Sequence, residues 1–406
     1  MAAAAGLTNL ELSTNDILNA PQPLGEFDYV LAHGIYAWVP ASIRDALMPL
    51  IGRSLTANGL AFLSYTTLPG CRVRQIARDI LQDSVRNIAA PAERLAATRE
   101  CMEFMVATWS ETDPLQNAAR HEMNALLARI PEAIFHDEMN ETYAPQFVSD
   151  VATHAERHGL RYLCDCRPAI NTEAFFPSDQ RKQLRQRAGG DWVRLEQMQD
   201  FAYLTRYRES IFCRHHGTID RGADWTRLQR LHAQGQFIPG EPDDAEPNVF
   251  VFRVEENARF TTADAKLADL LRLIGKANPG SIPLAGKIDG PAVGDTVLRF
   301  YLMGWLSLHS EPFPFTLTPG ERPVASPLAR LQAMQGETKL ATLHHKTLEI
   351  ANAAGRHFVA LLDGTRTRRD LATEMAQFTG EPLETVAARM NESLARVART
   401  ALLSIQ

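Results

Sequence analysis

Two short stretches near the start of the sequence place side chains that could bind a ligand at or shortly after the ends of apolar runs. Asp16 follows a run that ends at Leu12, and Ala32-His33-Gly34 ends the run FDYVLA. A carboxylate can accept a hydrogen bond from an amino group, and a glycine lets a ligand approach the backbone closely. If both runs are strands of one parallel sheet, these residues lie at its ligand-binding edge.

Apolar and aromatic side chains accompany these polar ones. Ile17 could cover a flat ring, and Tyr36 and Trp38 follow His33 within five positions. Aromatic faces can wall a substrate channel or stack on a cation. The same residues also have plain structural explanations: Asp16 as a turn cap, His33 as a structural histidine, Tyr36 and Trp38 as core. The pattern alone leaves both explanations open.

A metal site is the other chemistry that the residue types suggest. Cys164 and Cys166 lie in one strand-like segment, and Cys213, His215 and His216 in another. The C-x-C spacing is not the usual C-x-x-C of zinc sites, and the two groups are far apart in sequence. We therefore expect buried thiols and no metal.

Three early runs of strand length must position the first group of residues: 7–12, 27–32 and 60–65. They are apolar without clean alternation, which is typical of strands covered on both faces. Between the second and third, apolar residues at helical spacing predict a helix that begins near Pro40 and ends at Asn58-Gly59. Strand, helix and strand at this spacing predict a βαβ unit and an α/β fold.

The rest of the chain predicts further α and β segments and one linker. Residues 72–130 read as helices, and 144–158 as a helix closed by Gly159. The expected strands are 160–166, 209–214 and a β-like run at 248–255. The expected helices are 263–273, 297–308 and a last block from about 336. The expected linker is 239–247. We expect one core domain formed by 1–71 and 135–216, interrupted by a helical insertion at 72–134. A middle domain at 217–334 and a C-terminal helical domain at 335–406 follow it.

Composition narrows the class of protein. The 406 residues are 45% hydrophobic and 22% charged, with a net charge of −6, which argues against a nucleic-acid binder that works through bulk charge. The basic segment 181–187 is expected to be a solvated helix face. No apolar run is long enough to span a bilayer, the first residues do not resemble a signal peptide, and five cysteines suggest no disulfide framework, so we expect a cytoplasmic protein.

Several motifs together resemble a known family. ELSTNDILN, FDYVLAHGIYAWVP and NGLAFLSYTTLPG resemble the third to fifth strands of class I S-adenosylmethionine-dependent methyltransferases, and more narrowly those with a "methyltransferase regulatory domain". The resemblance continues through 135–163, 207–216, 321–333 and the LLDGTRTR turn. It implies an incomplete Rossmann-like sheet with a helical insertion, an α+β middle domain and a small winged-helix-like C-terminal domain.

The resemblance also implies roles for single residues. Asp16 would bind the adenine amino group, and Ile17 would lie against its ring. Ala32, His33 and Gly34 would meet the methionine moiety of S-adenosylmethionine. Trp38 would belong to the same cofactor site, Tyr36 and Tyr65 would line the methyl-transfer channel as the catalytic residues, and His136, Glu138 and Asn140 would face that cleft. The similar bacterial protein-lysine methyltransferases suggest protein lysine as the acceptor.

Two parts of the family pattern do not occur in this sequence. The resemblance starts at the third strand, so the glycine-rich loop after the first strand and the acidic residue that ends the second have no counterpart. We therefore expect a truncated methyltransferase with impaired cofactor binding. Its helical insertion is expected to serve regulation or dimerisation, so a homodimer is one expected assembly. The alternative is a catalytically inactive homologue that serves as a binding, regulatory or oligomerisation protein.

Overall fold

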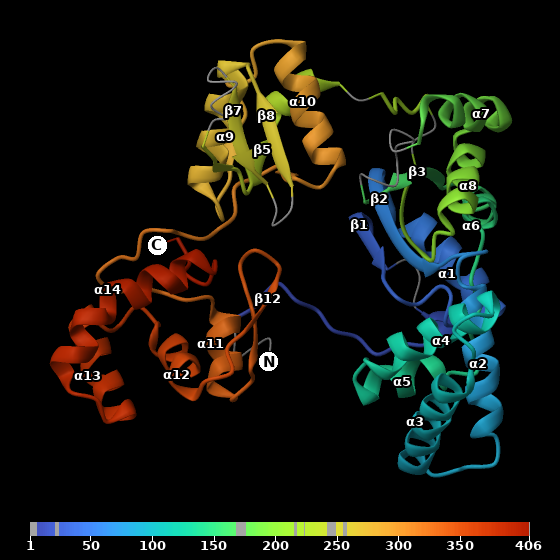
Figure 1. Cartoon of the computed structure of the whole chain (residues 1–406), viewed down its shortest axis with the longest axis horizontal. Coiled ribbons are helices and arrows are strands. Elements are labelled where there is room, and N and C mark those ends of the chain that lie inside the picture. Colours follow the sequence, from blue (N-terminus) through green and yellow to red (C-terminus); the bar gives the residue numbers. More distant parts are fainter. Residues whose placement is uncertain are drawn as a thin grey trace. The chain divides into compact units, whose positions relative to one another are not determined.

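The computed structural model of the chain describes residues 6–20, 24–167, 176–214, 217–222, 224–241, 249–254 and 258–405. The chain divides into two compact units, coloured by sequence in Figure 1. One unit is Thr14–Arg221, and the other combines Met1–Ser13 with Gly222–Gln406. Each unit is described by itself.

A four-stranded sheet organises the first unit. Its strands are β1 (Phe27–Ala32), β2 (Leu55–Thr66), β3 (Arg161–Asp165) and β4 (Tyr207–Cys213). They lie in the order β1-β2-β4-β3, with β1 parallel to β2 and β4 antiparallel to both of its neighbours. Helix α1 (Ala41–Ser54) connects β1 to β2, which confirms the predicted βαβ unit.

Two details of that unit differ from the sequence-based prediction. The helix ends at Ser54, and Asn58-Gly59 lies inside β2, because Leu55 already pairs with Phe27 of β1. The run Leu7–Leu12 is not a strand: Leu12 is 81% exposed, and among the described residues no strand pairs with this run. An extended segment without a ladder partner leaves its backbone groups to water and has nothing to hold it as a strand.

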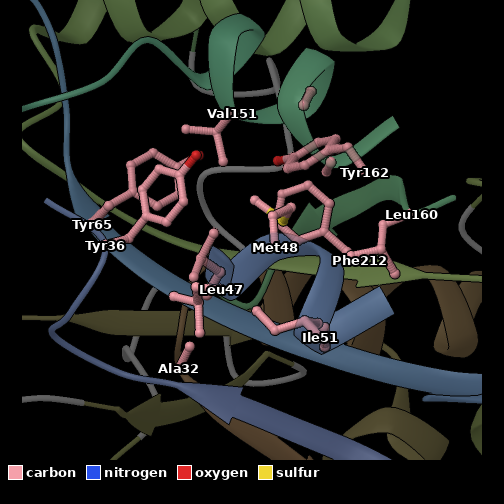
Figure 2. Close-up of a cluster of buried hydrophobic side chains, with 14 of the residues drawn as sticks. Ala32, Tyr36, Leu47, Met48, Ile51, Tyr65, Val151, Leu160, Tyr162 and Phe212 are labelled. Atoms are coloured by element: carbon pink, nitrogen blue, oxygen red, sulfur yellow. The ribbon is translucent and has the colours of Figure 1, made fainter. Parts of the chain in front are cut away.

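Helices cover one face of the sheet. Besides α1 these are α6 (Val148–Glu156) and α8 (Trp192–Tyr203), which follows α7 (Ser178–Ala188). Figure 2 shows the resulting core, in which Met48 of α1 and Val151 of α6 lie among side chains of the strands. Burial of these apolar side chains fixes α1 and α6 against the strands that they follow or precede.

Strand β1 is covered on one side only. Ala32 is buried and Val30 packs against the core, whereas the alternate residues Phe27, Tyr29 and Leu31 are 45%, 70% and 72% exposed. Successive side chains of a strand point to opposite faces, so these three residues form one bare apolar row. The expectation that both faces of this strand are covered is wrong for β1.

The predicted helical insertion lies between β2 and α6. It consists of α2 (Arg72–Ser84), α3 (Pro91–Thr108), α4 (Pro114–Leu127) and α5 (Pro131–Glu138). Met102, Met123, Leu126 and Ile134 form its own small core. The insertion confirms the reading of 72–130 as helices.

The second unit contains a mixed α/β part and a helical part. The first part comprises η4 (Trp225–Arg230), β5 (His232–Gly235), β6 (Ile238–Pro239), β7 (Phe250–Arg253), β8 (Arg259–Thr262), α9 (Ala265–Ala277), β9 (Ile282–Pro283), α10 (Pro291–Leu302) and β10 (Leu306–His309). The predicted helix 297–308 is therefore only half right, because its end pairs with β5 as β10. Most of the predicted linker, 239–247, lies outside the described residues.

The last part of the chain is a core of four helices with a short hairpin. Its elements are α11 (Pro327–Met334), β11 (Lys339–Ala341), β12 (Thr347–Glu349), α12 (Ala353–Leu361), α13 (Arg368–Thr379) and α14 (Leu383–Arg399). The turn LLDGTRTR separates α12 from α13, as the sequence predicts, and Thr367 and Asp370 form a capping box at the start of α13. Helices with a two-stranded wing are the winged-helix arrangement.

Candidate functional site

A hydrogen bond to β2 fixes the backbone just after the carboxyl end of β1. Gly34 adopts a φ of +66°, and its N–H donates to Oγ of Ser64 at 2.8 Å. The same oxygen lies 3.0 Å from Nδ1 of His33. Ser64 is wholly buried, whereas His33 and Gly34 are exposed and open space lies where a side chain of residue 34 would begin. A ligand can therefore approach the backbone at this strand end.

The two tyrosines proposed as catalytic are brought together, but inside the core. Their ring centroids are 6.0 Å apart, and Figure 2 shows the rings side by side. The hydroxyl of Tyr36 lies 2.7 Å from Nδ1 of His154, and that of Tyr65 lies 2.9 Å from Oγ of Ser210. Burial raises the pKa of Tyr36 to about 12 and the pKa of Tyr65 above its usual range. Both hydroxyls are therefore neutral hydrogen-bonding groups and not bases at neutral pH.

Trp38 does stack on a cation, but the cation belongs to the protein. The guanidinium carbons of Arg74 and Arg78, on α2, lie 5.4 and 5.5 Å from its ring centroid. Tyr143 packs beside Trp38 at 4.9 Å, and both arginines lie within 6 Å of its ring too. An aromatic pair that already holds two guanidinium groups leaves little room for a substrate cation between its rings.

A buried carboxylate holds these arginines in place. Glu138 is fully buried; it pairs with Arg74, lies 3.6 Å from Arg78 and accepts from Arg129 at 3.1 Å. The resemblance to methyltransferases implied that His136, Glu138 and Asn140 face the methyl-transfer channel. The side chain of His136 is 73% exposed and contacts Asp137, and the carbonyl of Asn140 accepts hydrogen bonds from Arg78 and Gln82.

Sequence reasoning missed Arg74, Arg78 and Tyr143. The available signal was the spacing of the two arginines, four apart on one helix, which places them on the same face as an i, i+4 pair. Nothing in the sequence connects that face to Trp38, which precedes it by a strand and a helix.

The segment after α5 ties the ends of β1 and β2 together. Ala144 N donates to the carbonyl of Ala37 at 2.8 Å, and Gln146 N donates to the carbonyl of Thr66 at 3.0 Å. Leu68 N returns a hydrogen bond to Gln146 O at 3.0 Å. The loops that follow the two parallel strands are thus fixed relative to each other by one crossing segment.

Asp16 and Ile17 lie at the start of the first unit, on the short helix η1 (Ile17–Asn19). The carboxylate of Asp16 accepts from Leu18 N at 3.0 Å and from the side chain of Asn19 at 3.3 Å, so it caps this turn. Ile17 packs against the core of the first unit. The exposed Asp16 keeps lone pairs that its cap does not use, so its proposed contact with adenine stays a prediction.

The cysteine segments form no recognisable zinc site within the described residues. Cys164 and Cys213 lie on β3 and β4, and His215 and His216 are outside the described residues. Asp165, Cys166 and Glu209 do converge, but Arg167 lies 3.1 Å from Asp165 and 3.4 Å from Glu209.

The thiol of Cys166 belongs to this cluster, and Cys166 is an exposed residue, so the expectation of buried thiols is wrong for it. Burial and the adjacent carboxylates of Glu209 and Asp165 raise its pKa to about 12. The guanidinium of Arg167 lies close to both carboxylates and is the cation that this cluster already holds.

Comparisons with known proteins identify two parts of the chain and its fold. Residues 131–214 match the family described as "predicted methyltransferase regulatory domain", and residues 321–402 match "PKMT, C-terminal winged helix domain". The structure is similar to that of PKMT2 from Rickettsia typhi, with a TM-score of 0.84 and 21% identity over 99% of this chain and 86% of that one. PKMT2 has also been solved in complex with AdoHcy.

Curated relatives cover less of the chain. Uncharacterized protein RP789 of Rickettsia prowazekii is 28% identical over 59% of this chain and 43% of its own length. Uncharacterized protein sll1526 of Synechocystis is 25% identical over 53% and 42%, respectively. The chain thus spans about half the length of the curated relatives that it matches.

No helix among the described residues combines the length and the apolar character that crossing a membrane requires. The family matches and the fold confirm the resemblance inferred from the motifs, including the winged helix at the end of the chain. Two parts of the chain thus match the methyltransferase regulatory domain family and the PKMT C-terminal winged helix family, on a fold similar to that of PKMT2.

Proposed function

We propose that this chain takes part in methyl transfer from S-adenosylmethionine to a protein lysine. The two family matches and the fold support the reaction class, and the AdoHcy complex of PKMT2 supports the cofactor. The proposal that the methyl acceptor is a protein lysine rests only on the name of PKMT2.

The end of β1 is the observation that carries the proposal. It presents an exposed glycine in a left-handed conformation, with open space above it, and a buried serine that fixes the strand end. These are the features that a strand end needs in order to meet a ligand with its backbone. The cofactor would supply a methyl group bonded to a positively charged sulfur.

The residues of this chain would mainly bind the cofactor and orient it toward the acceptor amine. Asp16 and Ile17 would hold the adenine end, and Ala32, His33 and Gly34 would face the amino-acid end. Direct methyl displacement needs reactants held in line and a neutral amine more than it needs an acid or a base. The neutral, buried hydroxyls of Tyr36 and Tyr65 fit a role as walls that keep this region dry.

Weak cofactor binding can be tested by saturation-transfer NMR with AdoHcy. We expect transfer to both the adenine and the methionine protons. Gly34→Val should abolish it, because a β-branched side chain at positive φ is strained and would fill the open space. Gly190→Val is the matched control, since Gly190 has a φ of +85° and equally open surroundings. No transfer to the unaltered chain would contradict cofactor binding by this polypeptide.

The acceptor needs its own test. Mass spectrometry after incubation with S-adenosylmethionine and a lysine-rich protein should show mass gains of one methyl group on lysine residues. The same protein with its lysines acetylated is the control. Methylation that survives acetylation would exclude lysine as the acceptor.

A binding or oligomerisation role is the second candidate, and the bare row on β1 favours it. Phe27, Tyr29 and Leu31 expose apolar area on an edge strand, where polypeptides can add by backbone pairing. If a homodimer forms through β1, analytical ultracentrifugation should show it at micromolar concentration. Tyr29→Lys should then dissociate the dimer into monomers. A dimer that survives this substitution would place the interface elsewhere, for instance on the helical insertion.

A further inference from the structure

Ser64 bridges two groups at the end of β1 with a single hydroxyl. Its oxygen lies 2.8 Å from the backbone N of Gly34 and 3.0 Å from Nδ1 of His33. An N–H can only donate, so the oxygen accepts from Gly34. The hydroxyl then has one hydrogen left to donate and one lone pair left to fill.

The position of that hydrogen decides the tautomer of His33. If Nδ1 carried a proton, it would donate to Ser64, and the serine hydrogen would be buried with no other acceptor recorded among the described residues. A buried donor without a partner is destabilising. The favoured arrangement has Ser64 donating to Nδ1, which places the ring proton of neutral His33 on Nε2.

We propose that Ser64 is a positioning residue that holds His33 as the Nε2–H tautomer and presents this N–H to a ligand carboxylate. His33 is exposed, and its ring packs beside Phe62 with 5.9 Å between centroids, so the donor is both accessible and oriented. Nδ1 is occupied by Ser64, and Nε2–H has no free lone pair. His33 is then a hydrogen-bond donor and not the base that deprotonates the methyl acceptor.

The tautomer can be measured without any ligand. Long-range ¹H–¹⁵N NMR at about pH 8, where an ordinary histidine is neutral, should show His33 with a protonated Nε2 and an unprotonated Nδ1. Ser64→Ala should shift the ring toward a mixture, and Ser64→Thr, which keeps the hydroxyl, should restore it. Ser210→Ala is the matched control, because it removes another wholly buried hydroxyl of the same sheet without touching His33.

Two results would overturn the assignment. One is a wild-type ring with its proton on Nδ1, and the other is an unchanged tautomer in a Ser64→Ala variant whose amide spectrum shows that it is folded. If Ser64→Ala does not fold, the wild-type and Ser64→Thr spectra still decide between the two tautomers.

The carboxylate has two sources, the amino-acid end of the cofactor and an acidic residue of a protein substrate. This step rests on the proposed function. If the cofactor is the source, Ser64→Ala should weaken AdoHcy binding about fivefold, as one lost hydrogen bond would, and leave methylthioadenosine, which lacks the carboxylate, unaffected. Unchanged AdoHcy binding assigns the contact to the substrate if Ser64→Ala instead slows methylation of an acidic protein.

Equal loss for AdoHcy and methylthioadenosine would give Ser64 a merely structural role. Should neither compound bind the unaltered chain, the proposed function fails, while the NMR result for Ser64 and His33 still stands by itself.

Discussion

Gly34 is the residue whose backbone most directly shapes the proposed site. Its φ of +66° lies in the left-handed region, which costs a residue with a Cβ about 1 kcal/mol or more. We expect Gly34→Ala to lower the free energy of unfolding by about that amount in urea denaturation and to weaken the AdoHcy signal. Gly190→Ala carries the same backbone strain and should lower stability alike without changing that signal. Equal effects of both variants on AdoHcy would argue against a ligand at Gly34.

Single residues also show where prediction from sequence ends. The pattern placed His33 and Gly34 at a strand end, and that is where they lie. It left open whether Tyr36 is a core or a site residue and could not show that Tyr65 is core, because their hydroxyl partners are 118 and 145 positions away. Nor could it show Ser64, an ordinary serine inside an apolar run, as the group that organises His33. Such contacts arise only when the sheet brings distant segments together.

At the level of elements, α8 is fastened to the sheet by a buried ionic cluster. Arg208 of β4 donates to Glu196 at 2.6 Å and to Asp200 at 2.9 Å, both on α8, and to the hydroxyl of Tyr162 at 3.0 Å. The three charged side chains are fully buried. Removing Arg208 would leave the carboxylates of Glu196 and Asp200 buried without their cation, which strongly destabilises the folded chain.

We expect Arg208→Met to reduce the free energy of unfolding by about 3 kcal/mol near neutral pH. Burial raises the pKa of both Glu196 and Asp200 above their ordinary values, so each takes up a proton more readily in the folded chain than in the unfolded chain. Stability therefore falls as pH rises above those ordinary values, and more steeply in the variant. Urea midpoints at about pH 5 and about pH 7.5 should show a smaller loss at the lower pH. Arg86→Met, at a 72% exposed side chain, is the control.

The elements themselves were mostly predictable, and the exceptions share a cause. The strands at 161–165 and 207–213 and the helices of the insertion have strong local patterns. The segment 306–309 continues the apolar spacing of α10, so it reads as helix, but pairing with β5 draws it into a strand. The run 7–12 looks like a strand and has no partner. In both cases the presence or absence of a neighbouring strand decides the structure, and local sequence does not contain that information.

At the scale of the second unit, histidines lie where the mixed α/β part meets the winged helix. Gln234 of β5 donates from Nε2 to Pro279 O and to Nε2 of His344, both at 2.7 Å. Phe313 lies between His309 and His344, with 4.4 Å from its ring centroid to each. Because Pro279 O fixes the amide of Gln234 as a donor, His344 must accept, and it can do so only while neutral.

This contact should weaken in acid. Burial lowers the pKa of both His309 and His344, and neighbouring basic side chains lower it further: His232 and His345 at His309, and Lys346, His309 and His345 at His344. The carbonyl of Pro279 opposes the effect at His344. The unfolded chain therefore binds protons more readily than the folded one, so the stabilisation is present above the ordinary histidine pKa of about 6.5 and is lost as pH falls through the lowered values.

Hydrogen exchange of 313–316 and 342–346 should accelerate between about pH 7.5 and about pH 5, after correction for intrinsic rates. His344→Gln should flatten this dependence, since it removes one of the titrating groups. His136→Gln, at an exposed position of the other unit, should leave it unchanged. Equal pH dependence in all three proteins would show that the histidine contact is not the sensor.

The one-sided cover of β1 has a consequence for local stability. Only β2 pairs with this strand among the described residues, and one of its faces is bare, so opening β1 breaks fewer contacts than opening any inner strand. Its amides that face away from β2 should exchange fastest of all in the sheet. Yet β1 carries His33 and Gly34. Any polypeptide that pairs along this edge raises the opening free energy of the site, so edge pairing and ligand binding are thermodynamically linked and each strengthens the other.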